Sequence, residues 1–109
     1  MEKIIGFEVK EFDYSKINGE TYHLKVVGAK VKEGADGEYL SVSSRSTEDN
    51  SMPNVRANIA VEWRLAQFLT AVGLKKLGPL KELISKEFDA TLIVHPYDGT
   101  NFIDVNQYL

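Results

Sequence analysis

The chain has 109 residues, a formal net charge of −3 and no cysteine, with 43% hydrophobic and 27% charged residues. This composition excludes disordered and fibrous classes, and the lack of cysteine excludes a disulfide scaffold, a thiolate zinc site and a cysteine nucleophile. We expect one domain over residues 1–109 in the cytoplasm, with no membrane segment, because no stretch approaches the ~20 apolar residues of a spanning helix.

The first half of the chain alternates apolar and polar residues, as half-buried strands do. The pattern predicts strands over residues 5–9, 22–31 and 38–47. Asn18-Gly19, between the first two, predicts a hairpin turn. In the second strand the apolar parity switches at Gly28, where a β-bulge would restore the alternation.

The middle of the chain combines a loop, a short strand and helical spacing. Residues 47–53 are too polar for a core segment, and the alternation that starts at Val55 predicts a short strand leading directly into a helix. Gly73 stands where a helix would end, and Gly78-Pro79 predicts a second short helix over residues 80–85. The apolar helix positions are Leu65, Phe68, Leu69 and Val72.

Two more strands close the chain around the turn Asp98-Gly99, with apolar residues from Phe88 to Val94 and again at Ile103 and Val105. Strands, a helix and a final hairpin in this order predict a mainly β fold (α+β by content): a five-stranded OB-like Greek-key barrel with a helical segment between strands 3 and 4. A twisted sheet packed on helices without closure is the rival architecture.

The motifs that carry catalysis are missing from the sequence. There is no Gly-x-x-x-x-Gly-Lys-Ser/Thr phosphate loop, and no serine lies in a Gly-x-Ser-x-Gly elbow. His23 and His95 lack the spacing of metal ligands, and His23 falls on the outward parity of its strand. We therefore expect no enzymatic activity, no metal and no cofactor.

Cations, aromatic rings and hydroxyls fall opposite the core positions of several strands. Bases stack on aromatic rings for ~1–3 kcal/mol each, and cations follow phosphates, so this combination suits a single-stranded nucleic acid. Tyr108 also has the outward parity, whereas Trp63 is expected to cover one barrel end as part of the core. The predicted nucleic-acid contacts are Lys25, Lys30, Lys32, Tyr39, Ser41, Arg45, Arg56 and Phe102.

From about Tyr22 onward the chain resembles phage-encoded single-stranded-DNA-binding proteins of the OB-fold type. The resemblance rests on residues 37–42, 65–74, 86–92 and 101–108. It implies binding of single-stranded DNA without sequence specificity, in the replication or recombination module of a phage and with the proteins of that module as partners. Tyr39 would be a stacking platform, and Arg45 would lie further along the same face.

Two other classes stay open at this point. The first is a small non-catalytic protein-interaction module, a phage inhibitor or adaptor, using the loop around Glu48 and Asp49 or the acidic residues Glu8, Glu11 and Asp13. The second is a barrel that binds a small molecule or nucleotide. An open barrel edge is also compatible with an oligomer.

Overall fold

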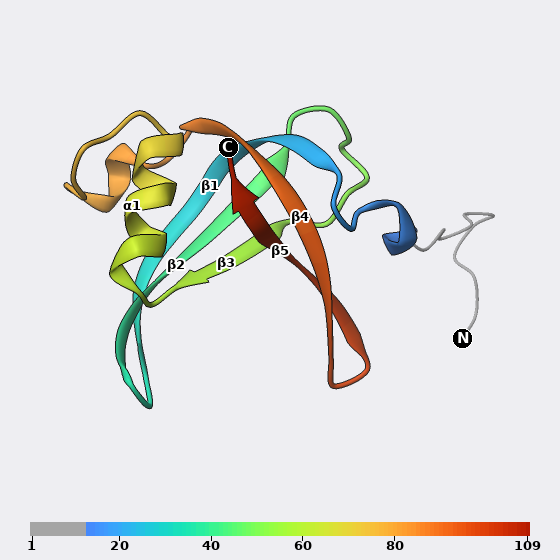
Figure 1. Cartoon of the computed structure of the whole chain (residues 1–109), viewed down its shortest axis with the longest axis horizontal. Coiled ribbons are helices and arrows are strands. Elements are labelled where there is room, and N and C mark those ends of the chain that lie inside the picture. Colours follow the sequence, from blue (N-terminus) through green and yellow to red (C-terminus); the bar gives the residue numbers. More distant parts are fainter. Residues whose placement is uncertain (1–12) are drawn as a thin grey trace, which may run out of the picture.

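A closed barrel of five strands, in the order β1-β2-β3-β5-β4, dominates the computed structural model, which describes residues 13–109 (Figure 1). Neighbouring strands are antiparallel except for β3 and β5, which are parallel. Helix α1 (Glu62–Ala71) lies between β3 and β4, which confirms the predicted OB-like barrel and excludes the open sheet. The strands are β1 (Thr21–Gly34), β2 (Gly37–Ser46), β3 (Val55–Ile59), β4 (Glu87–Tyr97) and β5 (Thr100–Tyr108).

The assignment of segments to barrel strands differs from the prediction. The strand expected at residues 5–9 lies outside the described residues, and the first barrel strand is β1. The short segment that starts at Val55 is a full member of the barrel as β3. It pairs with β2 from Leu40↔Ile59 to Ser44↔Val55, and Val55 also pairs with Ile103 of β5.

The Asn18-Gly19 pair forms a turn but not the hairpin that its sequence predicts. Tyr14–Lys16 is a 3-10 helix (η1), and the Glu20 N–H donates to the Ile17 carbonyl at 3.0 Å. Gly19 has φ 79°, which a glycine tolerates at the second central position of such a turn. Asn18 then bridges to Leu92 of β4, and Ile17 is fully buried. The turn therefore holds the segment before β1 against β4 and does not join two adjacent strands.

Two β-bulges set which side chains point outward. The register of β1 against β2 shifts between Val26 and Gly28, as the parity switch predicted. In β5, Gln107 and Val105 pair with the consecutive residues Thr91 and Leu92, so Asn106 is the extra residue. This second bulge reverses the parity and turns Tyr108 inward to 9% exposure. The outward orientation predicted for Tyr108 is therefore wrong.

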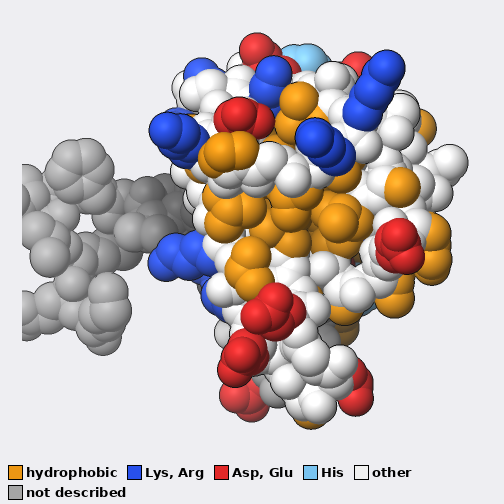
Figure 2. Space-filling model, turned by 90° about the vertical axis from the view of Figure 1, so that its left-hand side faces the viewer, with side chains coloured by type: hydrophobic (Ala, Val, Ile, Leu, Met, Phe, Trp, Pro, Cys, Tyr) orange, Lys and Arg blue, Asp and Glu red, His pale blue; other side chains and the backbone are white. Residues whose placement is uncertain are grey.

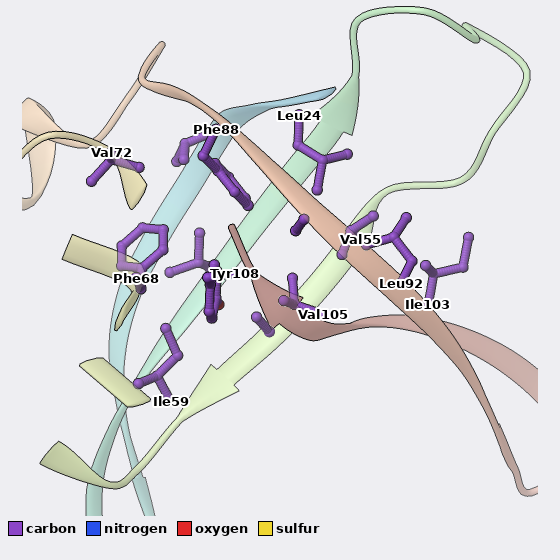
Figure 3. Packing of buried hydrophobic residues seen from close by; sticks show 14 of the residues in the cluster. Leu24, Val55, Ile59, Phe68, Val72, Phe88, Leu92, Ile103, Val105 and Tyr108 are labelled. Atoms are coloured by element: carbon purple, nitrogen blue, oxygen red, sulfur yellow. The ribbon is translucent and has the colours of Figure 1, made fainter. Parts of the chain in front are cut away.

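The core centres on three aromatic rings where α1 closes one end of the barrel (Figure 3). Phe68 lies with its ring centroid 5.9 Å from that of Phe88 and 5.6 Å from that of Tyr108, both edge-on. Met52 is also buried, so the loop over residues 47–53 does contribute a core residue, contrary to the prediction. The loop can bend inward because the Ser46 hydroxyl accepts hydrogen bonds from the N–H groups of Glu48 and Asp49.

Helix α1 has a regular C-terminus and an uncapped N-terminus. Gly73 has φ 80°, and the Leu74 N–H donates to the Leu69 carbonyl at 2.8 Å, which is the glycine-terminated end that was predicted. Trp63 is 62% exposed, so its predicted core role is wrong. It lies on the side of α1 opposite Phe68 and Leu69. The second helix is shorter than predicted, a 3-10 turn over Leu80–Glu82 (η2).

Val61→Asp is expected to stabilise the fold. Val61 is the N-cap residue of α1, has extended backbone angles and offers no side-chain hydrogen bond. An aspartate there would accept a bond from a free N–H of the first turn, which is worth about 1 kcal/mol. Thermal unfolding of dilute protein should show a higher Tm than wild type, and Val61→Asn is the uncharged control. A Tm equal to or below that of wild type in both variants would contradict the capping argument.

Candidate nucleic-acid interface

The outer face of β1, β2 and β3 carries the predicted basic residues. Leu40, Val42 and Ser44 point into the barrel, so the alternate residues of β2 point outward. The residues of β1 and β3 that pair with the outward residues of β2 lie on the same outer face. The pairs are Lys25↔Arg45, Gly28↔Ser43, Lys30↔Ser41, Lys32↔Tyr39 and Ser43↔Arg56.

A shallow hollow on this face brings together residues that are far apart in the sequence. Gly28, Ser41 and Ser43 are small and leave space between the longer side chains. Lys30, Lys32 and Arg56 also line the hollow and supply its positive charge. Without the bulge after Val26, Lys30 and Lys32 would point toward the opposite face of β1.

A second hollow continues this surface toward β5. Arg56 lines both hollows, and Phe102 and Asn101 line the second one together with Pro53 and Asn54. The parallel pairing of Val55 with Ile103 brings Arg56 and Phe102 together. Phe102 is 37% exposed, as its outward parity predicted. This surface therefore crosses β1, β2, β3 and β5. We call it the basic face, and it consists of the two hollows together with the outward residues of β1, β2 and β3 that include Lys25 and Arg45.

The electrostatics of the basic face contrast with the acidic chain as a whole. Within residues 13–109, no carboxylate lies within ion-pair distance of Lys25, Lys30, Lys32, Arg45 or Arg56. The outward residues of the three strands over this stretch include no aspartate or glutamate. Glu33 and Glu38 face each other on the opposite parity. The five cations are therefore free to neutralise an anionic ligand.

The structure groups the predicted contact residues unevenly. Lys30, Lys32, Ser41 and Arg56 share the first hollow, and Arg56 and Phe102 share the second. The ring of Tyr39 packs over Gly34 near the tip of the β1–β2 hairpin, because a Cβ at Gly34 would lie 3.3 Å from its Cε1 atom.

Lys25 and Arg45 form a cross-strand pair, and neither lines a hollow. The predicted contacts missed Asn54 and Asn101, which come from different segments and share no periodicity. Ser43 carried a signal that the predicted contacts did not use, namely the same parity as Ser41.

His23 lies outside the hollows and links β1 to β4. Its Nδ1 is 2.7 Å from Asp89 Oδ1 and its Nε2 is 2.9 Å from Glu87 Oε1. Hydrogen bonds to the Asp89 carboxylate, and next to the Glu87 carboxylate, raise the pKa of His23 above 6.5. Two carboxylate acceptors favour the doubly protonated ring, so below its raised pKa His23 links the two strands as a cation.

Stability is expected to depend on pH through His23. The pKa of His23 is higher in the folded protein than in the unfolded chain. The free energy of unfolding that its two hydrogen bonds add is therefore fully present below pH 6.5, and it is lost as the pH rises through the pKa of the folded state. The side chain is 37% exposed, which limits the effect to about 1 kcal/mol or less. Thermal unfolding of wild type and His23→Gln should differ most at about pH 5.5 and converge at high pH. A Tm difference that stays constant with pH would contradict this assignment.

Comparison with known proteins leaves the site to be interpreted from its own chemistry. No protein-family model matches the chain, and no curated protein matches it. In the part of the chain that the structure describes, no three His, Asp or Glu side chains come together as a metal site, and no helix is both long and apolar enough to cross a membrane. The basic face combines cations, small hydroxyls and an exposed ring, which can bind phosphates and stack a base.

Proposed function

We propose that the protein binds single-stranded DNA on the basic face, without sequence specificity. The observation that carries this proposal is the grouping of five cations on the outer face of three adjacent strands, with no ion-pair partner among residues 13–109, in a chain with a net charge of −3. Random placement of charge in an acidic protein would mix carboxylates among these cations. The resemblance seen in the sequence suggests the replication or recombination module of a phage as the setting.

The geometry of the face suits a single strand better than a duplex. The β1–β2 and β4–β5 hairpins project from the same end of the barrel and flank the face (Figure 1). Strand faces of OB-like barrels between these two loops are suited to extended oligonucleotides. Lys30, Lys32 and Arg56 would contact phosphates, while Phe102 would stack on a base. Contacts to phosphates and ring faces carry no base identity, which explains binding without sequence specificity.

Fluorescence anisotropy with a labelled oligo-dT strand tests this function directly. We expect micromolar or tighter binding that weakens with salt, with a slope of log K against log salt of about −2 to −3.5 for three to five phosphate contacts. A duplex of the same length should bind more weakly. Absence of single-strand binding at low salt, or equal affinity for the duplex, would contradict the proposal.

The alternative function, a protein-interaction module, was expected to use the acidic loop around Glu48 and Asp49. This loop supports the alternative less well than the basic face supports DNA binding. Asp49 Oδ1 accepts hydrogen bonds from both the N–H and the hydroxyl of Ser51, so one of its two carboxylate oxygens is engaged within the loop. These bonds lower the pKa of Asp49. Glu48 is exposed in the same loop, and Glu8 and Glu11 lie outside the described residues.

A further inference from the structure

A second surface is an apolar groove beside α1, which Tyr39 of the predicted nucleic-acid contacts also lines. The apolar residues that line this groove are Val31 from β1, Ile59 at the end of β3, the α1 N-cap residue Val61, Leu65 from α1, and Leu77. Figure 2 shows the same side of the molecule, with hydrophobic side chains gathered across its middle. Val31 is 51% exposed and Val61 is 47% exposed. Contiguous apolar side chains exposed in this way mark a surface that another molecule covers.

Charges of opposite sign lie at the two ends of the groove. Glu38 lines the groove, and so does Glu62 at the start of α1. Glu33 and Asp36 belong to the same β1–β2 hairpin as Glu38. Lys75 and Lys76 directly precede Leu77, in the segment between α1 and η2 at the other end of this side (Figure 1). Figure 2 shows most of the cations above the apolar patch, with carboxylates among them, and a cluster of carboxylates below it. None of these charges is ion-paired within residues 13–109.

We propose that the groove binds a second copy of this chain and forms a two-fold symmetric dimer. A two-fold axis through the apolar centre brings each copy's lysine end against the other copy's carboxylate end. The apolar centres then bury each other, and the opposite charges are paired at both edges. A surface with one sign of charge throughout would repel its own copy. The acidic β1–β2 hairpin at one end and the lysine pair beside Leu77 at the other end make this surface complementary to itself.

The dimer leaves the two hollows of the basic face accessible. Val31 lines the groove, whereas its neighbours Lys30 and Lys32 line the first hollow of the basic face. Consecutive residues of a strand point to opposite faces, so the groove and the basic face lie on the two sides of the same segment of β1. Lys30, Lys32, Arg56 and Phe102 therefore stay accessible in the dimer, and DNA binding through them can be tested apart from dimer formation.

Sedimentation equilibrium over a range of protein concentrations tests the dimer. Wild type should form a dimer, and Val61→Asp should weaken self-association about tenfold or more, because it places a charge in the apolar centre. This substitution is expected to stabilise the monomer fold, so the loss cannot be attributed to unfolding. Circular dichroism of the same samples checks this point. A wild type that remains monomeric, or a Val61→Asp variant that associates like wild type, overturns the proposal.

Charge reversal tests the orientation of the two copies. Lys75→Glu/Lys76→Glu makes both ends acidic, and Glu33→Lys/Glu38→Lys makes both ends basic. Each variant alone should be monomeric, whereas an equimolar mixture should form a heterodimer. Lys16→Glu/Lys25→Glu, with the same change of net charge as the first variant but away from the groove, should dimerise like wild type. A mixture that stays monomeric, or single variants that still dimerise, overturns the two-fold arrangement.

Discussion

Phe68→Ala is expected to lower the free energy of unfolding by about 3–5 kcal/mol. Phe68 is fully buried and contacts both Phe88 and Tyr108, so its removal leaves a cavity where α1 meets the barrel. The antiparallel strands around it are fixed by backbone hydrogen bonds and can relax only slightly into the space. A domain of this size has about 5–15 kcal/mol of stability in total. The variant should therefore be close to unfolding at moderate temperature.

Urea denaturation followed by circular dichroism measures this loss. Trp63→Ala is the matched aromatic control, because Trp63 is 62% exposed on the opposite side of the same helix. We expect it to change stability by about 0.5 kcal/mol or less. A Phe68→Ala loss below about 1 kcal/mol, or a larger loss in Trp63→Ala, would show that α1 does not close the barrel as described.

Lys30→Glu/Arg56→Glu is expected to weaken oligo-dT binding at low salt on the order of 100-fold. Both cations line the first hollow, and Arg56 also lines the second, so the double reversal removes two phosphate contacts and adds repulsion. The slope of log K against log salt should fall in magnitude by about 1.4. Both side chains are exposed, and therefore the Tm should be close to that of wild type. Anisotropy titrations at two salt concentrations give the affinity and the slope together.

A control with the same change of net charge separates a local site from overall charge. Lys16→Glu/Lys81→Glu reverses two exposed lysines, in η1 and η2, that line neither hollow. This variant should bind oligo-dT within about threefold of wild type. If the two double variants lose equal affinity, binding depends on net charge and not on the basic face.

Much of the fold follows from local patterns in the sequence. Alternation identified the buried residues Leu24, Leu40 and Val42, and the parity switch located the bulge in β1. Asp98-Gly99 has positive φ at both residues, as a two-residue hairpin of this composition requires. Each of these features is decided by residues within a few positions of one another, so a single segment contains the information.

The errors have a common origin in contacts between distant segments. Tyr108 faces inward because β4 imposes a bulge at Asn106, and no glycine marks this position in β5. Ile17 and Met52 are buried although their neighbours are polar, because the barrel offers space at its ends. Trp63 is exposed because Phe68, five residues later, fills the position under α1. The polarity of neighbouring residues in the sequence therefore could not predict which of these side chains are buried.

The candidate site divides in the same way. The sequence by itself determined that Lys30, Lys32 and Ser41 point away from the core, since strand parity follows from backbone geometry. Only the tertiary structure decided that Arg56 joins them and that Phe102 lies beside Arg56. Those neighbours depend on the register of β2 against β3 and on the parallel pairing of β3 with β5. Register is set by packing across the whole barrel, and a shift of one residue would separate these side chains.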